Sequence, residues 1–335
     1  MRFNSAPGVK RRHLLGSSLG LAVGSLAAPG RAPAQQAGTL RRVGWLSPTT
    51  GLRPAFLDAM RGFGWSEGKN IAYEVRAVDG RRERLAGAAA ELAAAKVDLI
   101  VAVAPSAIGA AQQATRDIPI VMAWWGGPDL VEAGIVASYA RPGGNVTGVD
   151  MLLRLLDAKR LDILHEAVPR ARKIAVLVYD MKRYEPQLPP VRKVAATRAL
   201  ELEVQDAMQA SRGYDGAFEA FAAAKAQALL VMWGPDVGRD WKTIVELANR
   251  WRLPAIYDKA EHAREGGLLS YGTHFSEMDR QAASYVDKIL RGAEPGMLPV
   301  EQPTRYELVV NQTTARALGI TVPRTLLLRA DETIG

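Results

Sequence analysis

Short apolar runs alternate along the chain with stretches whose apolar positions recur at helical spacing. The apolar runs are bounded by turn residues, which is typical of strands buried on both faces of a parallel sheet. The predicted strands span residues 43–46, 71–76, 97–103, 119–123 and 146–149, and then 173–179, 203–207, 228–233, 254–257, 268–271 and 304–310. The predicted helices span residues 54–61, 86–95, 106–115, 157–168, 190–200, 214–224, 240–251, 276–291 and 313–318.

This alternation predicts an α/β fold of parallel sheets covered by helices on both faces. It occurs as two successive series, so we expect two Rossmann-like lobes, at residues 40–150 and 151–275. From such a fold we expect residues 276–335 to form a crossover helix and a tail that pack across the lobes. A chain of 335 residues that is 48% hydrophobic can support two cores.

Charge argues against nucleic acid as a partner. Residues 1–34 hold five basic residues and no acidic one, so they contribute +5 of the net charge of +8. The charges after residue 34 are mixed, without the basic block that tracks a phosphate backbone.

The N-terminal segment predicts export. Basic residues at positions 10–12 precede an apolar stretch at residues 14–28 and the small-x-small sequence that ends at Ala34. This order is typical of a secretory signal, and the stretch is too short and too weakly apolar for a membrane span. The pair Arg11 and Arg12 resembles a twin-arginine signal, with an ordinary secretory signal as the alternative. The sequence has no cysteine to carry a lipid anchor, so we expect a free periplasmic protein.

The common enzyme motifs are missing. The loop after the first predicted strand lacks the Gly-x-Gly-x-x-Gly of dinucleotide-binding folds, and no Gly-x-Ser-x-Gly elbow occurs. The four histidines lack metal-binding spacing, and the absence of cysteine excludes thiolate sites. We therefore expect no catalytic residues, no metal and no cofactor.

Several short segments, in order and at matching spacing, resemble one family. They are GWSEGKNI at residues 64–71, VDLIV at 97–101, TRDIPIV at 115–121, RPGGNVTG at 141–148, LVVN at 308–311 and ALGITVP at 317–323. The chain resembles the ABC transporter substrate-binding proteins that include tryptophan-binding proteins, from about residue 42 to 323. The resemblance implies a type I periplasmic-binding fold, a small-molecule ligand held by hinge closure and a membrane permease as partner. The chain departs from the family pattern at residues 124–129 and 180–183, where pocket residues are expected. An exported sensor domain that presents its ligand to a membrane receptor is the alternative function.

Ligands of parallel sheets bind beyond the carboxyl ends of the strands. The corresponding loops are residues 47–50, 104–107, 124–129, 179–182, 233–236, 257–261 and 271–274. They are rich in aromatic residues, which suit a flat or apolar ligand but can equally face the core: Trp124, Trp125, Trp233, Tyr179, Tyr257 and Tyr271. Trp45 lies inside a strand and is expected in the core.

Polar candidates occur in the same loops. Ser47, Thr49 and Ser106 can donate hydrogen bonds to a carboxylate, together with backbone amides near a helix start at Ser106, although Ser106 can equally be an N-cap. Ala104, in the loop before this helix, is a further candidate ligand contact. Asp236 and Asp258 can accept from an ammonium group, or can be turn and cap residues. Asp180 completes the set of candidate ligand-binding residues.

We predict that the protein is exported and cleaved near Ala34, because residues 10–34 combine a basic region, an apolar region and a small-x-small site. N-terminal sequencing of periplasmic material is expected to begin near Gln35. Substituting lysine for both Arg11 and Arg12 is expected to block export if the twin-arginine route applies. An intact Met1 on protein from the cytosol would contradict the prediction.

Overall fold

The computed structural model describes residues 40–49 and 51–335. The predicted export signal, with Arg11, Arg12 and Ala34, lies outside the described residues.

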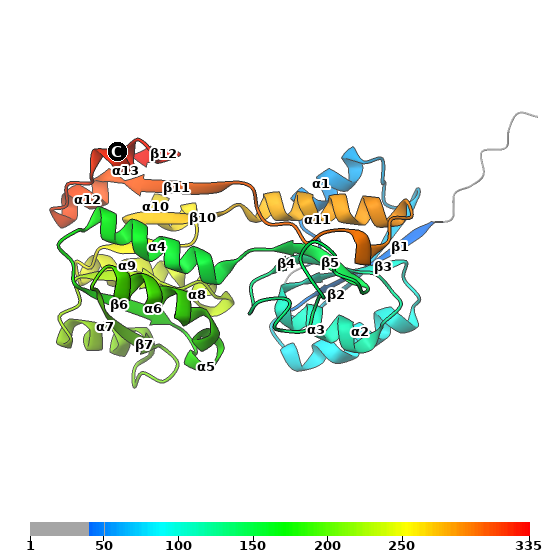
Figure 1. Cartoon of the computed structure of the whole chain (residues 1–335), viewed down its shortest axis with the longest axis horizontal. Coiled ribbons are helices and arrows are strands. Elements are labelled where there is room, and N and C mark those ends of the chain that lie inside the picture. The colour runs from blue at the N-terminus through cyan, green and yellow to red at the C-terminus, as the bar shows by residue number, and fades with distance from the viewer. Residues whose placement is uncertain (1–39, 50) are drawn as a thin grey trace, which may run out of the picture. The chain divides into compact units, whose positions relative to one another are not determined.

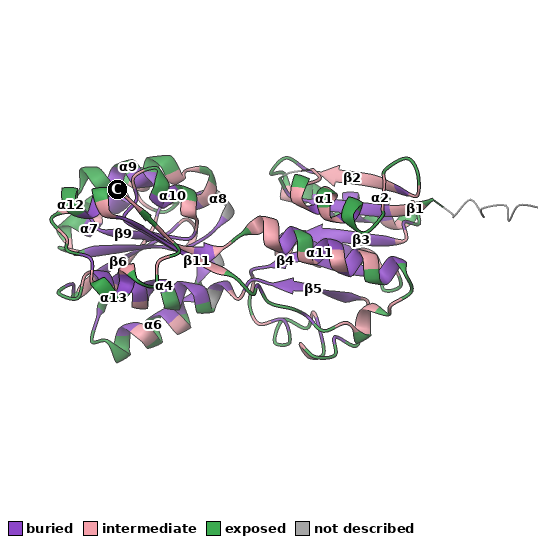
Figure 2. Ribbon diagram, turned by 90° about the horizontal axis from the view of Figure 1, so that it is seen from above, coloured by how far each residue is buried: buried purple, intermediate pink, exposed green. Residues whose placement is uncertain are grey.

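The first sheet has five parallel strands in the order β2-β1-β3-β4-β5 (Figure 1). Its strands are β1 (Arg41–Ser47), β2 (Ile71–Ala77), β3 (Leu99–Val103), β4 (Ile120–Trp125) and β5 (Val146–Asp150). Every residue of β3, β4 and β5 is buried (Figure 2). Burial on both faces explains why these strands are continuous apolar runs rather than alternating ones.

Four helices cover this sheet: α1 (Pro54–Gly62), α2 (Leu85–Ala94), α3 (Ala104–Ala114) and α11 (Phe275–Leu290). Successive strand residues point to opposite faces. Val43, Trp45 and Val101 therefore pack with α1 and α11, whereas Ile100 and Ala102 pack with α2 and α3. Trp45 is fully buried, as predicted.

The second sheet has seven strands in the order β12-β11-β10-β9-β8-β6-β7. All neighbours are parallel except β10 and β11, which run antiparallel. Its strands are β6 (Lys173–Val178), β7 (Glu201–Asp206), β8 (Ala228–Val231), β9 (Ala255–Tyr257), β10 (Leu269–Thr273), β11 (Tyr306–Asn311) and β12 (Glu332–Ile334).

Helices cover both faces of the second sheet as well. One core contains residues of α4, α6, α12 and α13, and the core on the other face contains residues of α7 and α9. The helices are α4 (Leu153–Ala167), α5 (Met181–Tyr184), α6 (Leu188–Thr197), α7 (Gly213–Ala223), α8 (Pro235–Arg239), α9 (Trp241–Arg250), α10 (Ala260–Arg264), α12 (Gln312–Leu318) and α13 (Arg324–Leu327). Short 3-10 turns lie at Arg82–Arg84, Glu185–Gln187 and Pro295–Met297.

In the described part of the chain, three segments connect the two halves: β5 to α4, β10 to α11, and the segment between α11 and β11 (Figure 1). Helix α11 packs against α1, β4 and β5 of the first half, after which β11 returns to the second sheet. None of the described helices combines the length and the apolar character that a membrane crossing requires.

The predicted α/β class with parallel sheets in two sets is confirmed. One local prediction is wrong: Ser106 is not an N-cap. Helix α3 begins two residues earlier, at Ala104, and the capping position is Val103, without a side-chain hydrogen bond. Ala104 adopts the left-handed region, with φ of 72°, which turns the chain directly from β3 into the helix.

A substitution at Gly148 in β5 tests how closely β4 and β5 pack in the first sheet. Its φ is +134°, and a Cβ atom there would lie 2.3 Å from the backbone oxygen of Met122 in β4. Moving the backbone of Met122 to relieve this clash costs free energy. Gly148→Ala is therefore expected to lower the free energy of unfolding by about 2 kcal/mol or more.

Chemical denaturation measures the change, and Gly144→Ala is the matched control. Gly144 is exposed and a Cβ atom there meets nothing within 4 Å. Equal midpoints for the two variants would contradict the prediction.

Candidate functional site

A cavity of about 960 Å³ is lined by the carboxyl ends of strands from both sheets. The first half contributes the loop after β1, the start of α3 and the segment after β4, and the second half contributes the segments after β8, β9 and β10. The lining residues include Pro48, Thr49, Arg53, Arg82, Ala104, Pro105, Ser106, Trp124, Tyr184, Gln187, Trp233, Arg239, Asp258, Lys259, Glu261, Arg264, Thr273, His274, Phe275, Ser276 and Glu307.

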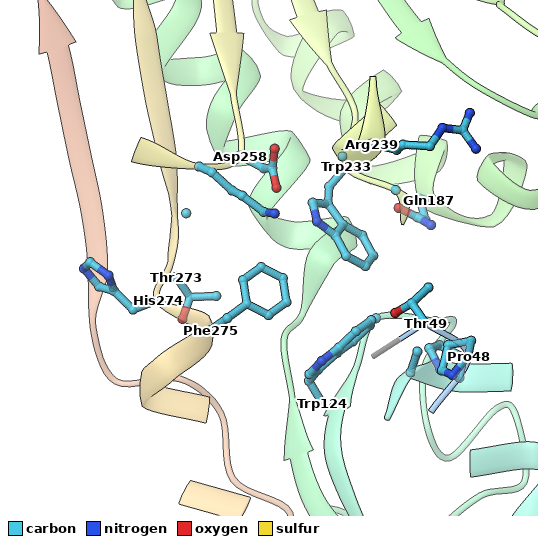
Figure 3. Close-up of a pocket in the computed structure, with 18 of the residues that line it drawn as sticks. Pro48, Thr49, Trp124, Gln187, Trp233, Arg239, Asp258, Thr273, His274 and Phe275 are labelled. Atoms are coloured by element: carbon cyan, nitrogen blue, oxygen red, sulfur yellow. The ribbon is translucent and has the colours of Figure 1, made fainter. Parts of the chain in front are cut away.

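Three aromatic rings meet in this cavity (Figure 3). Trp124 packs edge to face against Trp233, with 5.3 Å between ring centroids, and against Phe275 at 5.8 Å. The rings of Trp233 and Phe275 are tilted by 32° at 6.3 Å. Both tryptophans belong to the set predicted from the sequence, and together with Phe275 they form an apolar wall for a flat ligand.

Trp125 does not line the cavity. Successive strand residues point to opposite faces, so Trp125 packs in the core beneath α2 and α3 while Trp124 faces the other way. The indole N–H of Trp125 donates to the carbonyl of Pro128 at 2.6 Å. The interpretation of Trp125 as a ligand contact is therefore corrected to a core residue.

The three candidate tyrosines also pack away from the cavity. Tyr179 contacts Tyr214 with 6.3 Å between ring centroids, and Tyr271 stacks on Tyr306 at 5.8 Å. Tyr257 is 1% exposed and lies in the core formed with α7 and α9. For each of them, the core alternative that the sequence left open describes the structure.

The candidate hydroxyl residues divide in the same way. Thr49, Ala104 and Ser106 line the cavity, but Ser47 does not. Ser47 is fully buried, and its Oγ accepts a hydrogen bond from the backbone N–H of Thr49 at 3.3 Å. Ser47 therefore shapes the loop that presents Thr49.

Of the three candidate aspartates, Asp258 lines the cavity. Asp180 caps α5 by accepting from the backbone N–H of Lys182 at 3.1 Å, so it does not reach the cavity. Asp236 lies on α8, and its side chain is outside the described part of the structure.

A buried ion pair lies beneath the cavity. Asp157 and Arg160, both on α4, are 2.5 Å apart, and their side chains are 0% and 1% exposed. Arg160 Nε also donates to the carbonyl of Tyr271 at 2.6 Å. Burial raises the pKa of Asp157, and Arg160 and the backbone N–H of Trp233 oppose that shift. The pair thus connects α4 to the ends of the strands that carry Trp233 and Tyr271.

Asp258 is compensated by nearby cationic and polar groups. His262 Nδ1 lies 3.3 Å from its carboxylate. Burial acts to raise the pKa of Asp258, but His262, Arg160 and Lys259 together lower it below its ordinary value. Asp258 is therefore ionised at neutral pH.

Several lining residues were not predicted as site residues. Phe275 precedes the predicted start of its helix by one residue, and Lys259 lies in a predicted loop without having been singled out. Tyr184 and Gln187 belong to a turn that no periodic pattern indicated. A basic residue next to a candidate strand-end aspartate was the available signal for Lys259.

Three buried polar atoms of the cavity walls have no hydrogen-bond partner among the described residues. They are the indole N–H of Trp124, the side-chain oxygen of Gln187 and the hydroxyl of Thr273. Unpaired buried polar groups are costly, and these three atoms belong to side chains that line the cavity. Within the described residues, no cluster of His, Asp and Glu is arranged to hold a metal ion.

Comparisons with known proteins identify relatives of the chain. The family model described as ABC transporter substrate binding protein matches residues 50–334. The chain is 26% identical over 270 residues to the tyrosine-binding protein of Clostridioides difficile strain R20291, a match that covers 80% of this chain and 76% of that protein.

Solved structures share the fold. A conserved domain protein from Vibrio cholerae has a TM-score of 0.77 and 26% identity, with 88% of this chain and 100% of that chain covered. The ABC domain from Streptococcus pneumonia in complex with L-Trp has a TM-score of 0.75 and 21% identity, with the same coverage.

The Asp157–Arg160 pair gives a testable prediction. Arg160→Met leaves Asp157 buried without its cation, so the free energy of unfolding is expected to fall by about 3–5 kcal/mol. The loss is expected to be larger at pH 8 than at pH 5. The pKa of Asp157 is higher in the folded state than in the unfolded state. The free energy of unfolding therefore falls as the pH rises from the unfolded pKa to the folded pKa.

Arg61→Met is the matched control, because Arg61 pairs with Asp58 at the same i, i+3 spacing but on the surface. Its expected cost is about 0–1 kcal/mol. Thermal or urea unfolding at both pH values measures the difference, and similar losses for the two variants would refute the role given to the buried pair.

Proposed function

The chain belongs to the ABC transporter substrate binding protein family, and from that premise we propose that it is the exported solute-binding component of an import system. Its ligand is a small molecule with an aromatic or otherwise flat apolar body and a carboxylate. The two halves close on this molecule, which is then handed to a membrane permease.

The contact of Trp124, Trp233 and Phe275 is the observation that carries the ligand class. The rings come from both sheets and from the start of α11, so a flat molecule among them contacts both halves at once. A ligand shifts a hinge toward closure only if it binds the closed arrangement better, which contacts to both halves provide.

The relatives support an aromatic body. One is described as a tyrosine-binding protein and another was solved with L-Trp. Strand β4 of this chain ends in two adjacent tryptophans, of which Trp124 lines the cavity and Trp125 packs in the core.

The polar groups of the cavity support orientation of a carboxylate. Thr49 and Ser106 supply hydroxyl groups from the first half. The indole N–H of Trp124 is a buried donor that has no acceptor among the described residues. Nothing in this set resembles a nucleophile held by a base, which fits a family of binding proteins rather than enzymes.

We expect aromatic amino acids or aromatic acids to raise the melting temperature of the purified protein in a metabolite screen. Binding to the folded state alone adds about 2.7 kcal/mol at a ligand concentration of about 100 times Kd. For a chain of this size that corresponds to a rise of a few degrees. Trp124→Leu is expected to weaken binding about tenfold or more, because it removes stacking and burial.

Trp251→Leu is the matched control, since Trp251 is 42% exposed and lies outside the cavity. A screen in which sugars, polyamines or inorganic anions give shifts and aromatic acids give none would disprove the ligand class. Conversion of the bound compound would disprove the binding role.

A further inference from the structure

The cavity walls carry more basic than acidic side chains. Among the described lining residues, Arg53, Arg82, Arg239, Lys259 and Arg264 are basic, whereas Asp258, Glu261 and Glu307 are acidic. Some of these charges are already compensated by partners within the protein. The remaining ones determine which ligand charge is favoured.

Three of the arginines have carboxylate partners. Arg53 is 2.8 Å from Asp279, whose side chain is 5% exposed. Arg239 is 2.7 Å from Asp240. Arg264 is 3.2 Å from Glu307 and also pairs with Glu332. These three guanidinium groups are therefore structural ion-pair partners in the cavity walls and not the groups expected to bind an anion.

Lys259 differs from these arginines, because it forms no ion pair with any of the described residues. Its ammonium lies 5.2 Å from the ring centroid of Phe275, on the aromatic wall itself. The residue is half-buried at the end of β9. A cation held in an apolar, partly desolvated site attracts an anion more strongly than one in water does.

The acidic side of the cavity is already compensated where it is buried. Asp258 is 5% exposed and has His262 at 3.3 Å, with the charges of Arg160 and Lys259 nearby. Glu307 lies between Arg264 and His274, at 3.2 and 3.3 Å. Glu261 is exposed to solvent. Among the described lining residues, a ligand ammonium group would therefore find no buried carboxylate that lacks a charged neighbour.

The unpaired polar atoms near Phe275 also favour an anion. The indole N–H of Trp124 can only donate, and the ring of Trp124 is 5.8 Å from that of Phe275. The hydroxyl of Thr273, two residues before Phe275, is buried without a partner and can donate as well. Both side chains lie around Phe275 in Figure 3.

We infer that Lys259 is the carboxylate-binding and specificity-determining residue of the cavity, which selects aromatic carboxylates with a net negative charge over zwitterionic aromatic amino acids. This inference rests on the proposed function, because it uses the same aromatic wall. It narrows the ligand to aryl-alkanoic and related aromatic acids that lack an α-ammonium group.

Four compounds with one carbon skeleton test the inference: 3-phenylpropionate, L-phenylalanine, 3-phenylpropanamide and 2-phenylethylamine. Calorimetry or tryptophan fluorescence on the purified chain measures each Kd. The acid is expected to bind about tenfold or more tighter than the amino acid and the amide, and the amine weakest, because Lys259 is a lining cation that forms no ion pair with the described residues.

Variants of Lys259 assign the effect to that residue. Lys259→Met is expected to weaken binding of the acid about tenfold or more and to leave the amide within about twofold, since only the charged partner is lost. Lys259→Arg keeps the positive charge and is expected to retain most of the affinity for the acid. Lys242→Met is the matched control: the Lys242 ammonium also lies over an aromatic ring, 5.5 Å from that of Trp241, but outside the cavity.

The outcomes are distinguishable. Preference for the acid together with its loss in Lys259→Met supports the inference. Binding of the amino acid at least as tight as that of the acid, or indifference of the acid to Lys259→Met, overturns it and leaves the proposed aromatic ligand standing. If the protein binds non-aromatic compounds and none of these four or their indole counterparts, both the inference and the proposed ligand class fall.

Discussion

The edge-to-face contact between Trp124 and Trp233 is the interaction on which the cavity depends. Trp124 lies near the end of β4 and Trp233 two residues after β8, and Trp233 packs into the hydrophobic core of the first half although β8 belongs to the second sheet. An aromatic pair adds about 0.5–1.5 kcal/mol beyond the burial of its area. This contact joins the halves through side chains, next to the chain segments that connect them through the backbone. The apolar wall of the cavity is thus built from the same rings that connect the two halves.

The buried Asp157–Arg160 pair supports that contact from below. A buried ion pair is costly to desolvate, and it is tolerated where further hydrogen bonds satisfy its groups. Arg160 supplies such a bond to the carbonyl of Tyr271, and the neighbouring Gly272 brings β10 so close to β9 that a Cβ atom would lie 1.8 Å from the backbone oxygen of Asp258. Arg160 and Gly272 therefore hold the ends of β9 and β10 close together.

The fold was predictable because its signal is long and redundant, whereas the site depends on single choices. The alternation of side chains along a strand predicts that Trp124 and Trp125 point to opposite faces. Both faces of the first sheet, however, pack against apolar residues of helices. Nothing local to these two residues distinguishes the face that leads to the cavity. The same ambiguity applied to Tyr257 and Tyr271, which lie at strand ends yet pack into cores. Phe275 was missed because a phenylalanine at a helix start is ordinary in an amphipathic pattern.

Charges were the least predictable part of the site, since their effect depends on partners that are distant in the chain. Arg160 lies in a helix where an isolated basic residue is usually exposed, yet it is 1% exposed, pairs with Asp157 and donates to the carbonyl of Tyr271 in β10. From the sequence, Asp258 was a candidate acceptor for an ammonium group or a turn and cap residue, and its proximity to His262, Arg160 and Lys259 becomes visible only when the fold brings these groups together. Residue identity at a strand end therefore specifies which charges are available, and the folded chain decides which of them remain uncompensated. Because uncompensated charge in a half-buried wall dominates the electrostatics of binding, selectivity in such a pocket is a property of the tertiary contacts rather than of any local motif.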